Sequence, residues 1–402
     1  MTSAAHRRTA MLGLWMLAWM LLPARSAPPL LLAQAADRGR DLMPLILWHA
    51  EGEGHGRPAV DSGIAYFLST QHEVRAYDAR TGRARWVGRT GEPGAATAGS
   101  RVVVSGSMAV AGDYNLVAFD LRTGDERWRF APAVGYGPGI YLGDPTPETV
   151  LAGSPAGRLY AIASATGDVR WSSVIAADNV TTVFAPASDG GVVAAAYTTF
   201  RAPNAGGLVL FDLLTGRERW RAAFPKDPDR WLGTGSAGGP LLIDELVVAA
   251  AGNGVIYAFD RDDGAIRWTL PALNGLPPVL RGPFPAPPET AGADFRPLAA
   301  FGSTLVAGSL KGVIVAYDVH SRRELWRYDG SWTGSVGFGL HADRRSVYVP
   351  FVSGRHVALD LATGLERWRT AEASGGFSWT AASDGQRVYL AGGNGGYVAI
   401  AR

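Results

Sequence analysis

The fold is decided by the stretch Ala118-Phe119-Asp120-Leu121-Arg122-Thr123-Gly124-Asp125-Glu126-Arg127-Trp128. The residues leading to Asp120 indicate a strand, and those leading to Trp128 predict a second strand. Between the two strands, the Asp accepts hydrogen bonds from backbone N–H groups just ahead, and the Gly supplies the positive φ of a type I turn followed by a bulge. The stretch therefore predicts a hairpin in which the acid is structural and not catalytic.

This segment recurs along the chain. Seven copies end in Trp, at successive spacings of 42, 43, 49, 48, 58 and 42 residues, and such a period predicts a propeller or a solenoid. Ala163 replaces the Asp in the third copy, and Arg322 replaces the turn Gly in the sixth, where a left-handed conformation costs about 1 kcal/mol. The structural repeat residues are Asp78, Gly82, Trp86, Asp120, Gly124, Trp128, Gly167, Trp171, Asp212, Gly216, Trp220, Asp260, Gly264, Trp268, Asp318, Trp326, Asp360, Gly364 and Trp368.

Two further short strands precede each copy, as at residues 58–60 and 64–67 in the first unit. Each unit thus has four strands. A four-stranded sheet with two apolar faces is marginal alone and needs a neighbour on each side, and the repeated Trp is large enough to fill the gap between neighbours. The units are therefore expected to be propeller blades.

The two ends of the chain predict how the ring closes. The last copy begins at Gly396 and stops before any turn or Trp, so one strand is missing there. Residues Leu45 to Trp48 form a short apolar strand that ends in Trp and has no partner earlier in the chain. We therefore expect an all-β, eight-bladed propeller over residues 45–402, with antiparallel four-stranded blades and the N-terminal strand completing the last blade. A solenoid would need polar caps, whereas both ends are apolar.

Composition narrows the classes of function. Of 402 residues, 47% are hydrophobic and 18% charged, which is typical of a folded globular protein. The formal net charge is +2, and no basic footprint for nucleic acid is present. The chain has no cysteine, which excludes disulfides, thiolate zinc sites and iron–sulfur ligation.

Residues 1–35 are typical of a signal peptide. Arg7 and Arg8 supply the charge, residues 11–22 the apolar stretch, and Ala33-Gln34-Ala35 a small-x-small cleavage site. Residues 36–44 are a short linker. We expect a periplasmic or extracellular protein with no membrane span after cleavage; an uncleaved N-terminal anchor is the alternative.

Ala-x-Asp-x-x-Thr-Gly-x-x-x-Trp, as in residues 118–128 and 358–368, resembles the tryptophan-docking motif of the pyrroloquinoline-quinone-like propellers. That superfamily includes quinoprotein dehydrogenases and noncatalytic relatives such as the BamB-like propellers of outer-membrane assembly, which the chain resembles most in style. The dehydrogenases carry a vicinal cysteine pair and long blade insertions, and this chain lacks the cysteines. The BamB-type lipoprotein is anchored through a lipidated cysteine, so the resemblance implies a soluble or differently tethered relative.

Two sets of side chains are candidates for small-ligand or metal chemistry. His49, Glu51, Glu53 and His55 alternate and would face one way in an extended strand, as metal ligands could. Glycines interleave with them, so we expect a mobile polar loop and no metal site. The second set would form an aromatic rim over the central channel and consists of Tyr136, Tyr141, Trp231, Trp332, Phe338, His341, Phe377 and Trp379.

The sixth copy contains a proline-rich insertion, from Pro271 to Pro297, that would project from the disc. Its aromatic and arginine residues are of the types enriched in interface anchors. The partner-binding candidates are Arg281, Phe284, Phe295 and Arg296. The alternative is that the loop folds back and buries its own phenylalanines.

These observations favour an exported, noncatalytic and monomeric scaffold that binds a protein partner in the cell envelope, as in outer-membrane protein assembly. No cofactor and no nucleic-acid partner are expected. The alternatives are an enzyme similar to the dehydrogenases that use pyrroloquinoline quinone (PQQ) and a propeller that senses a small ligand.

Overall fold

Antiparallel sheets form where the repeat predicts them in the computed structural model of the chain. The structure describes residues 43–91, 101–112, 114–132, 139–178, 180–189, 191–200, 205–225, 236, 238–270, 295–337, 339–371, 381–392 and 396–402, except for the side chains of 295–297. All of these residues belong to one compact unit, Leu42–Arg402. None of the helices in the described part of the chain is long and apolar enough to cross a membrane.

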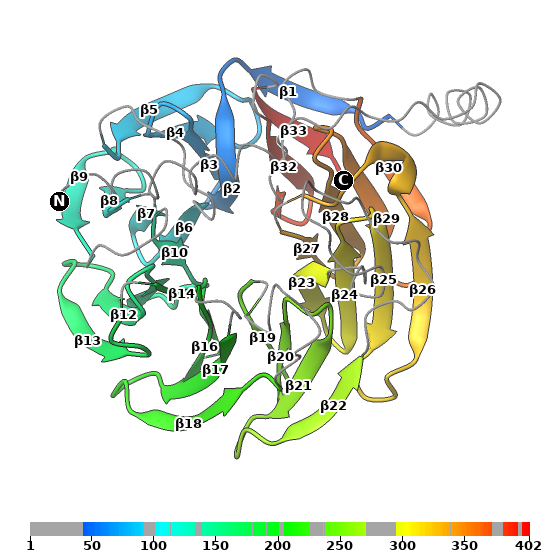
Figure 1. The fold of residues 1–402 in the computed structure, drawn as a ribbon. Helices are drawn as coiled ribbons and strands as arrows, with labels where there is room; N and C mark the ends of the chain where they lie inside the picture. The colour runs from blue at the N-terminus through cyan, green and yellow to red at the C-terminus, as the bar shows by residue number, and fades with distance from the viewer. Residues whose placement is uncertain are drawn as a thin grey trace, which may run out of the picture. The chain divides into compact units, whose positions relative to one another are not determined.

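The first four blades follow the chain, each from an inner to an outer strand (Figure 1). Blade 1 comprises β2 (Gly54–Asp61), β3 (Ile64–Ser69), β4 (Glu73–Asp78) and β5 (Ala84–Arg89). Blade 2 comprises β6 (Arg101–Ser105), β7 (Met108–Gly112), β8 (Leu116–Asp120) and β9 (Glu126–Phe130). Blade 3 comprises β10 (Tyr141–Leu142), β11 (Thr149–Gly153), β12 (Arg158–Ala163) and β13 (Val169–Val174). Blade 4 comprises β14 (Thr181–Val183), β15 (Ala187–Ser188), β16 (Val192–Thr199), β17 (Ala205–Asp212) and β18 (Glu218–Ala223).

The other four blades repeat this order, except that the last one takes its outer strand from the N-terminus. Blade 5 comprises β19 (Leu241–Ile243), β20 (Leu246–Ala250), β21 (Ile256–Asp260) and β22 (Ile266–Leu270). Blade 6 comprises β23 (Phe295–Phe301), β24 (Thr304–Ser309), β25 (Val313–Asp318) and β26 (Glu324–Asp329), and the 3₁₀ turn η2 (Ser331–Thr333) follows. Blade 7 comprises β27 (His341–Ala342), β28 (Ser346–Pro350), β29 (His356–Asp360) and β30 (Glu366–Arg369). Blade 8 comprises β31 (Ala382–Ser383), β32 (Arg387–Ala391), β33 (Tyr397–Ala401) and β1 (Ile46–Ala50).

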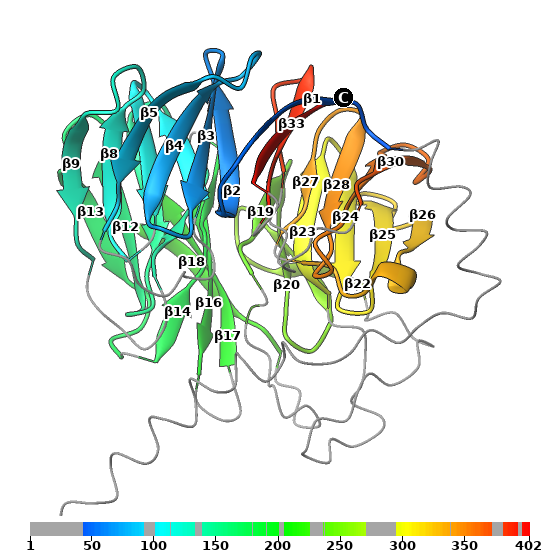
Figure 2. The same ribbon diagram turned by 90° about the horizontal axis from the view of Figure 1, so that it is seen from above.

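The expected ring closure is confirmed. β1 pairs antiparallel with β33, with His49 opposite Val398, and completes the sheet β1-β33-β32-β31. The two strands lie side by side in both ribbon views (Figures 1 and 2). Blades 1 and 2 are also joined by a parallel bridge between Arg57 and Arg101, which makes their two sheets continuous. The described strands thus form an all-β propeller. Their assignment to blades is consistent with the expected number of eight.

The bulge expected after the hairpin turn is present in seven blades. In blade 2 the register of β8 and β9 shifts between Ala118 and Phe119, directly before Asp120. Blades 1 and 3 to 7 show the same shift between their third and fourth strands. The extra residue increases the local twist of each outer strand.

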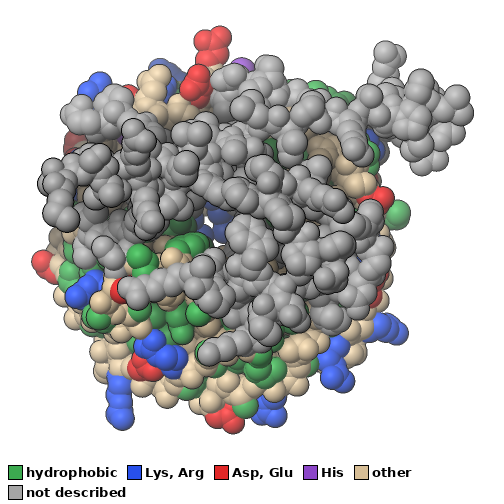
Figure 3. Space-filling model, in the orientation of Figure 1, with side chains coloured by type: hydrophobic (Ala, Val, Ile, Leu, Met, Phe, Trp, Pro, Cys, Tyr) green, Lys and Arg blue, Asp and Glu red, His purple; other side chains and the backbone are tan. Residues whose placement is uncertain are grey.

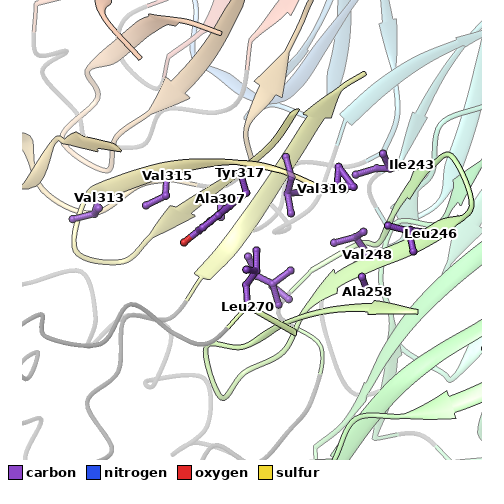
Figure 4. Close-up of a cluster of buried hydrophobic side chains, with 13 residues drawn as sticks. Ile243, Leu246, Val248, Ala258, Leu270, Ala307, Val313, Val315, Tyr317 and Val319 are labelled. Carbon is purple, nitrogen blue, oxygen red and sulfur yellow. The ribbon is translucent and has the colours of Figure 1, made fainter. Parts of the chain in front are cut away.

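The core lies in the seams between blades. Alternate residues of β20 face opposite seams, so Leu246 and Val248 join a cluster with blade 6, whereas Val247 and Ala249 join a cluster with blade 4. Figure 4 shows the first of these clusters, where Leu270 of blade 5 lies near Tyr317 and other residues of blade 6. Such a cluster occupies every seam of the ring, including the seam between blades 8 and 1. Because both faces of every blade are apolar, each blade depends on two neighbours.

Candidate functional site

Trp48 and five of the repeat tryptophans lie in the seams, each against the turn glycine of the next blade. Gly124 has a φ of 77°, and a Cβ added there would lie 2.6 Å from Cδ2 of Trp86. The turn therefore needs glycine both for its backbone conformation and for the indole that covers it. The same arrangement recurs in the pairs Trp48–Gly82, Trp86–Gly124, Trp128–Gly167, Trp171–Gly216, Trp220–Gly264 and Trp326–Gly364.

The indole nitrogens of the same tryptophans make hydrogen bonds across the seams. Trp86 Nε1 donates to the backbone oxygen of Leu121 at 3.0 Å. The equivalent bonds run from Trp48 to Ala79, Trp128 to Ser164, Trp171 to Leu213, Trp220 to Arg261 and Trp326 to Leu361. Each indole thus fills a seam and satisfies its own polar group there.

The motif aspartates hold the turns and an arginine that the sequence analysis missed. Asp120 Oδ1 accepts from the backbone N–H groups of Arg122 and Thr123, at 3.0 and 3.1 Å. Its Oδ2 accepts from Arg127 Nη2 at 2.8 Å, and this bond, followed by those from the backbone, lowers the pKa of Asp120 to about 2. The same ion pair joins Asp78–Arg85, Asp212–Arg219, Asp260–Arg267 and Asp360–Arg367. The sequence feature that could have revealed this ion pair is the Arg directly before the Trp in these copies.

In the sixth copy, Arg322 stands at the position of the turn glycine. Arg322 has a φ of 60°, the left-handed conformation expected for it. Its seam partner Trp268 is partly buried against the cluster between blades 5 and 6. Within the described residues, Trp268 makes no indole hydrogen bond like that of Trp86.

The metal-ligand candidates do not share a face. His49 is exposed in β1 of blade 8, and Glu51 and Glu53 are exposed in the connection to blade 1. His55 lies in β2, and only 3% of it is exposed, so the expected polar loop is in part a buried strand. The reason is that the chain crosses here from the closing strand to the first blade. The described residues contain no group of three or more His, Asp or Glu that could hold a metal ion.

The partner-binding candidates fall largely outside the described residues. Arg281 and Phe284 are not described. Phe295 and Arg296 belong by their backbone to β23, where Phe295 is opposite Ser309, so these two residues lie in the inner strand of blade 6 and not in the projecting loop. Their side chains are outside the description.

The aromatic rim candidates divide into described and undescribed residues. Tyr136, Trp231, Phe338, Phe377 and Trp379 lie outside the description. Tyr141, in β10, packs edge-on against Phe184, and burial raises its pKa to about 12. Trp332 lies in η2, with the guanidinium groups of Arg355 and Arg369 at 4.9 and 4.7 Å from its ring centroid. The described members thus belong to different blades, and the expected rim stays a prediction because most of its residues lie outside the description.

His341 belongs to a polar cluster built from the inner edges of several blades. Arg57 of β2 places Nη2 3.1 Å from Nδ1 of His341 in β27. Arg101 of β6 places Nη2 3.1 Å from Oδ1 of Asp144, which follows β10. Arg57 and Arg101 face each other across the parallel bridge, so blades 1, 2, 3 and 7 meet here. We call Arg57, Arg101, Asp144 and His341 the channel cluster.

The charges of the channel cluster influence one another. Burial, then the charge of Arg101, lowers the pKa of Arg57 below its ordinary value. Burial, then the charge of Arg57, lowers the pKa of His341 to about 3, so this imidazole is neutral at physiological pH. The charge of Arg101 lowers the pKa of Asp144, which remains a carboxylate.

The channel cluster faces an opening in the ring. The side chain of Asp144 is 69% exposed, whereas that of Arg101 is 13% exposed. Figure 3 shows a hollow near the middle of the face, with Lys or Arg side chains (blue) inside it. An arginine pair in a partly exposed cluster is suited to binding an anion.

Sequence comparison relates the chain to one family. The family profile described as outer membrane protein assembly factor BamB matches residues 41–270 and 303–402. The proteins of this name from Kangiella koreensis and Bordetella pertussis are 31% identical over 155 residues and 30% over 224, covering 38% and 50% of this chain. The chain covers 36% and 53% of their lengths, about half or less. The Burkholderia pseudomallei protein is 24% identical over 364 residues, covering 86% of this chain and 82% of that protein.

Solved structures share the fold. BamB from Moraxella catarrhalis superposes with a TM-score of 0.65 at 17% identity, covering 90% of this chain and 100% of that one. The quinohemoprotein alcohol dehydrogenase from Comamonas testosteroni superposes with a TM-score of 0.61 at 15% identity, covering 86% of this chain and 72% of that one. At these identities the likeness shows the propeller fold alone.

Proposed function

The chain belongs to the family of the outer membrane protein assembly factor BamB, and from this premise we propose that it is a noncatalytic scaffold of the cell envelope that binds protein partners in outer-membrane protein assembly. The observation that carries the proposal is the extent of the family match, which takes in residues on both sides of the insertion. Export through residues 1–35 to the periplasm, with cleavage near Ala36, is part of the proposal.

The architecture supports a binding role. Eight buried clusters join the blades into a ring, so the strands form a rigid support. Loops on such a support can vary without loss of the fold and are the usual place for recognition. A rigid partner also loses little conformational entropy on binding.

Two surfaces of this chain suit a protein partner. The insertion with Arg281 and Phe284 remains the first candidate, on its residue types. The second is Trp332, which is 41% exposed and has the guanidinium groups of Arg355 and Arg369 over its ring. Trp and Arg dominate binding energies at interfaces, and the two cation–π contacts restrict the orientation of the ring.

The proposal is tested in the native host. Deleting the gene should lower the amounts of integral outer-membrane β-barrel proteins, and the wild-type gene should restore them. The tagged protein should also co-purify from the envelope with the machinery that inserts those proteins, identified by mass spectrometry. Unchanged outer-membrane protein levels together with no such co-purification would contradict the proposal.

The contact surface is tested by two variants with a matched control. Arg281→Glu with Arg296→Glu and Phe284→Ala, and separately Trp332→Ala, should reduce recovery of the partner without changing the melting temperature. The control combines Arg80→Glu, Arg122→Glu and Leu214→Ala, all exposed on hairpin turns, and should leave recovery unchanged. Full recovery with both test variants, or variants that unfold, would exclude these surfaces.

The main alternative is a quinone-dependent dehydrogenase. Its support is the shared fold. The residues present do not fit the quinone site that the resemblance implies, because the chain has no cysteine pair and the described residues offer no group of three metal ligands. We therefore propose the scaffold and not the enzyme.

A further inference from the structure

The channel cluster carries more positive than negative charge. Arg57 and Arg101 are opposed within it by Asp144 alone, because His341 is neutral. Asp343 also faces His341, but it is paired with Arg402 of blade 8. Among the described residues around His341, the guanidinium groups therefore outnumber the carboxylates by one. Two guanidinium groups held close together in a confined opening are unfavourable unless an anion lies between them.

Arg57 and Arg101 of the channel cluster also have N–H donors that are not used in hydrogen bonds with described residues. Among the described residues, the Arg57 guanidinium makes one hydrogen bond, to His341. The Nε–H of Arg101 is buried and has no hydrogen-bond partner there. A guanidinium presents several N–H donors and no acceptor, and a buried donor left unpaired is costly. The unused donors belong to the two residues that carry the excess charge.

The bond with Arg57 decides the tautomer of His341. A guanidinium can only donate, so Nδ1 of His341 is the acceptor in its bond with Arg57 Nη2. The proton of the neutral ring must then be on Nε2. The ring is held by stacking on Tyr348, with centroids 5.8 Å apart and planes 17° apart. Nε2 is therefore the donor nitrogen of this ring.

We propose that the opening in the ring binds a small anion with carboxylate or phosphate groups, which Arg57 and Arg101 hold by paired N–H donors. Both groups match the fork of a guanidinium. Asp144 occupies one donor of Arg101 and limits the affinity by its own charge. The site goes beyond the scaffold function, since the inner edges of the blades and not an outer surface form it.

The experiment is calorimetric titration of the full chain with inorganic phosphate and, separately, with malonate, at low ionic strength. Saturable binding of one or both is expected, and which of them binds more tightly distinguishes phosphate from carboxylate ligands. Arg57→Gln and Arg101→Gln should each weaken binding about tenfold or more, as expected when a charged hydrogen bond is lost. Arg327→Gln is the matched control, because Arg327 is paired with Glu324 on an outer strand.

A fourth variant distinguishes a binding role from a structural one. Asp144→Asn removes the competing carboxylate and should tighten anion binding, whereas loss of a structural ion pair would not. In NMR spectra, the Nε–H signals of Arg57 and Arg101 should shift on titration with the anion and those of Arg327 should not. Absence of saturable binding, equal binding by the Arg57→Gln and Arg327→Gln proteins, or weaker binding by Asp144→Asn would overturn the proposal. If Arg57→Gln does not fold, Asp144→Asn and the NMR titration decide it.

Discussion

The indole Nε1 of Trp48 donates a hydrogen bond to the backbone oxygen of Ala79 at 3.0 Å, which docks the N-terminal strand on blade 1. Trp48 also lies against Gly82, as five of the repeat tryptophans lie against their turn glycines. Its ring is close to Phe67 and Tyr77 of blade 1 and to Tyr389 of blade 8. A residue near one end of the chain thus joins the last blade to the first.

Trp48→Ala should destabilise the ring by about 3–5 kcal/mol, the usual loss for a buried Trp replaced by Ala. A chain that starts at His49 should lose still more, because it removes most of β1 and exposes the edge of β33. Urea unfolding measures both. Leu45→Ala, at a side chain that is 67% exposed, is the control and should have little effect. A truncated chain as stable as the full one would refute closure by β1.

Gly124→Ala should cost clearly more than Gly63→Ala. Both glycines have a φ of 77°, so each substitution incurs the left-handed penalty of about 1 kcal/mol. A Cβ at Gly63 would meet no atom within 4 Å, whereas one at Gly124 would meet the indole of Trp86. The difference in unfolding free energy therefore isolates the seam contact, which we expect to be about 1–3 kcal/mol. Equal losses would mean that Trp86 moves aside freely.

Arg322→Gly should stabilise the protein by about 1 kcal/mol, because the left-handed turn is strained with any side chain. It should also let Trp268 approach the turn as the other tryptophans do. Arg322→Ala is the control, and it should give no gain because its Cβ remains. The melting temperatures of the three proteins make the comparison, and a gain with alanine equal to that with glycine would contradict the explanation.

Stability should fall in acid between about pH 4 and pH 2. Hydrogen bonds, first from the Arg seven positions ahead, lower the pKa of Asp120 and of Asp212 to about 2, below the unfolded value near 3.9. Such groups stabilise the folded state above the unfolded pKa and lose that effect as the pH falls through the folded one. Urea midpoints at pH 6, 4 and 2 measure the change. Asp120→Asn should reduce the midpoint at pH 6 and make the fall on acidification smaller.

The protein should not oxidise alcohols or sugars after reconstitution with pyrroloquinoline quinone and calcium. The cysteine pair that the related dehydrogenases place against the quinone is missing from this sequence. A dye-linked assay with a known quinoprotein as the positive control is the measurement. Stoichiometric cofactor binding accompanied by turnover would replace the scaffold proposal with the enzyme.

Much of the fold could be predicted because it depends on local patterns. The turn from Asp120 to Gly124 is specified within a few residues by hydrogen bonding and by φ, and alternation along β20 specifies which residues face each seam. Even the closure by Trp48 could be predicted, because the repeat leaves one strand missing at one end and one strand extra at the other. The ion pair of Asp120 with Arg127 was equally local but was overlooked.

The channel cluster could not be predicted from the sequence. Only His341 was named, as an aromatic residue, and its partner Arg57 is 284 positions away in another blade. Arg101 and Asp144 belong to no repeated pattern. The sequence by itself thus determined the blade, the repeat and the way the ring closes, since these follow from periodicity and turn chemistry. The tertiary structure alone decided which inner-strand side chains meet, because that depends on the closed ring bringing the inner edges of distant blades together.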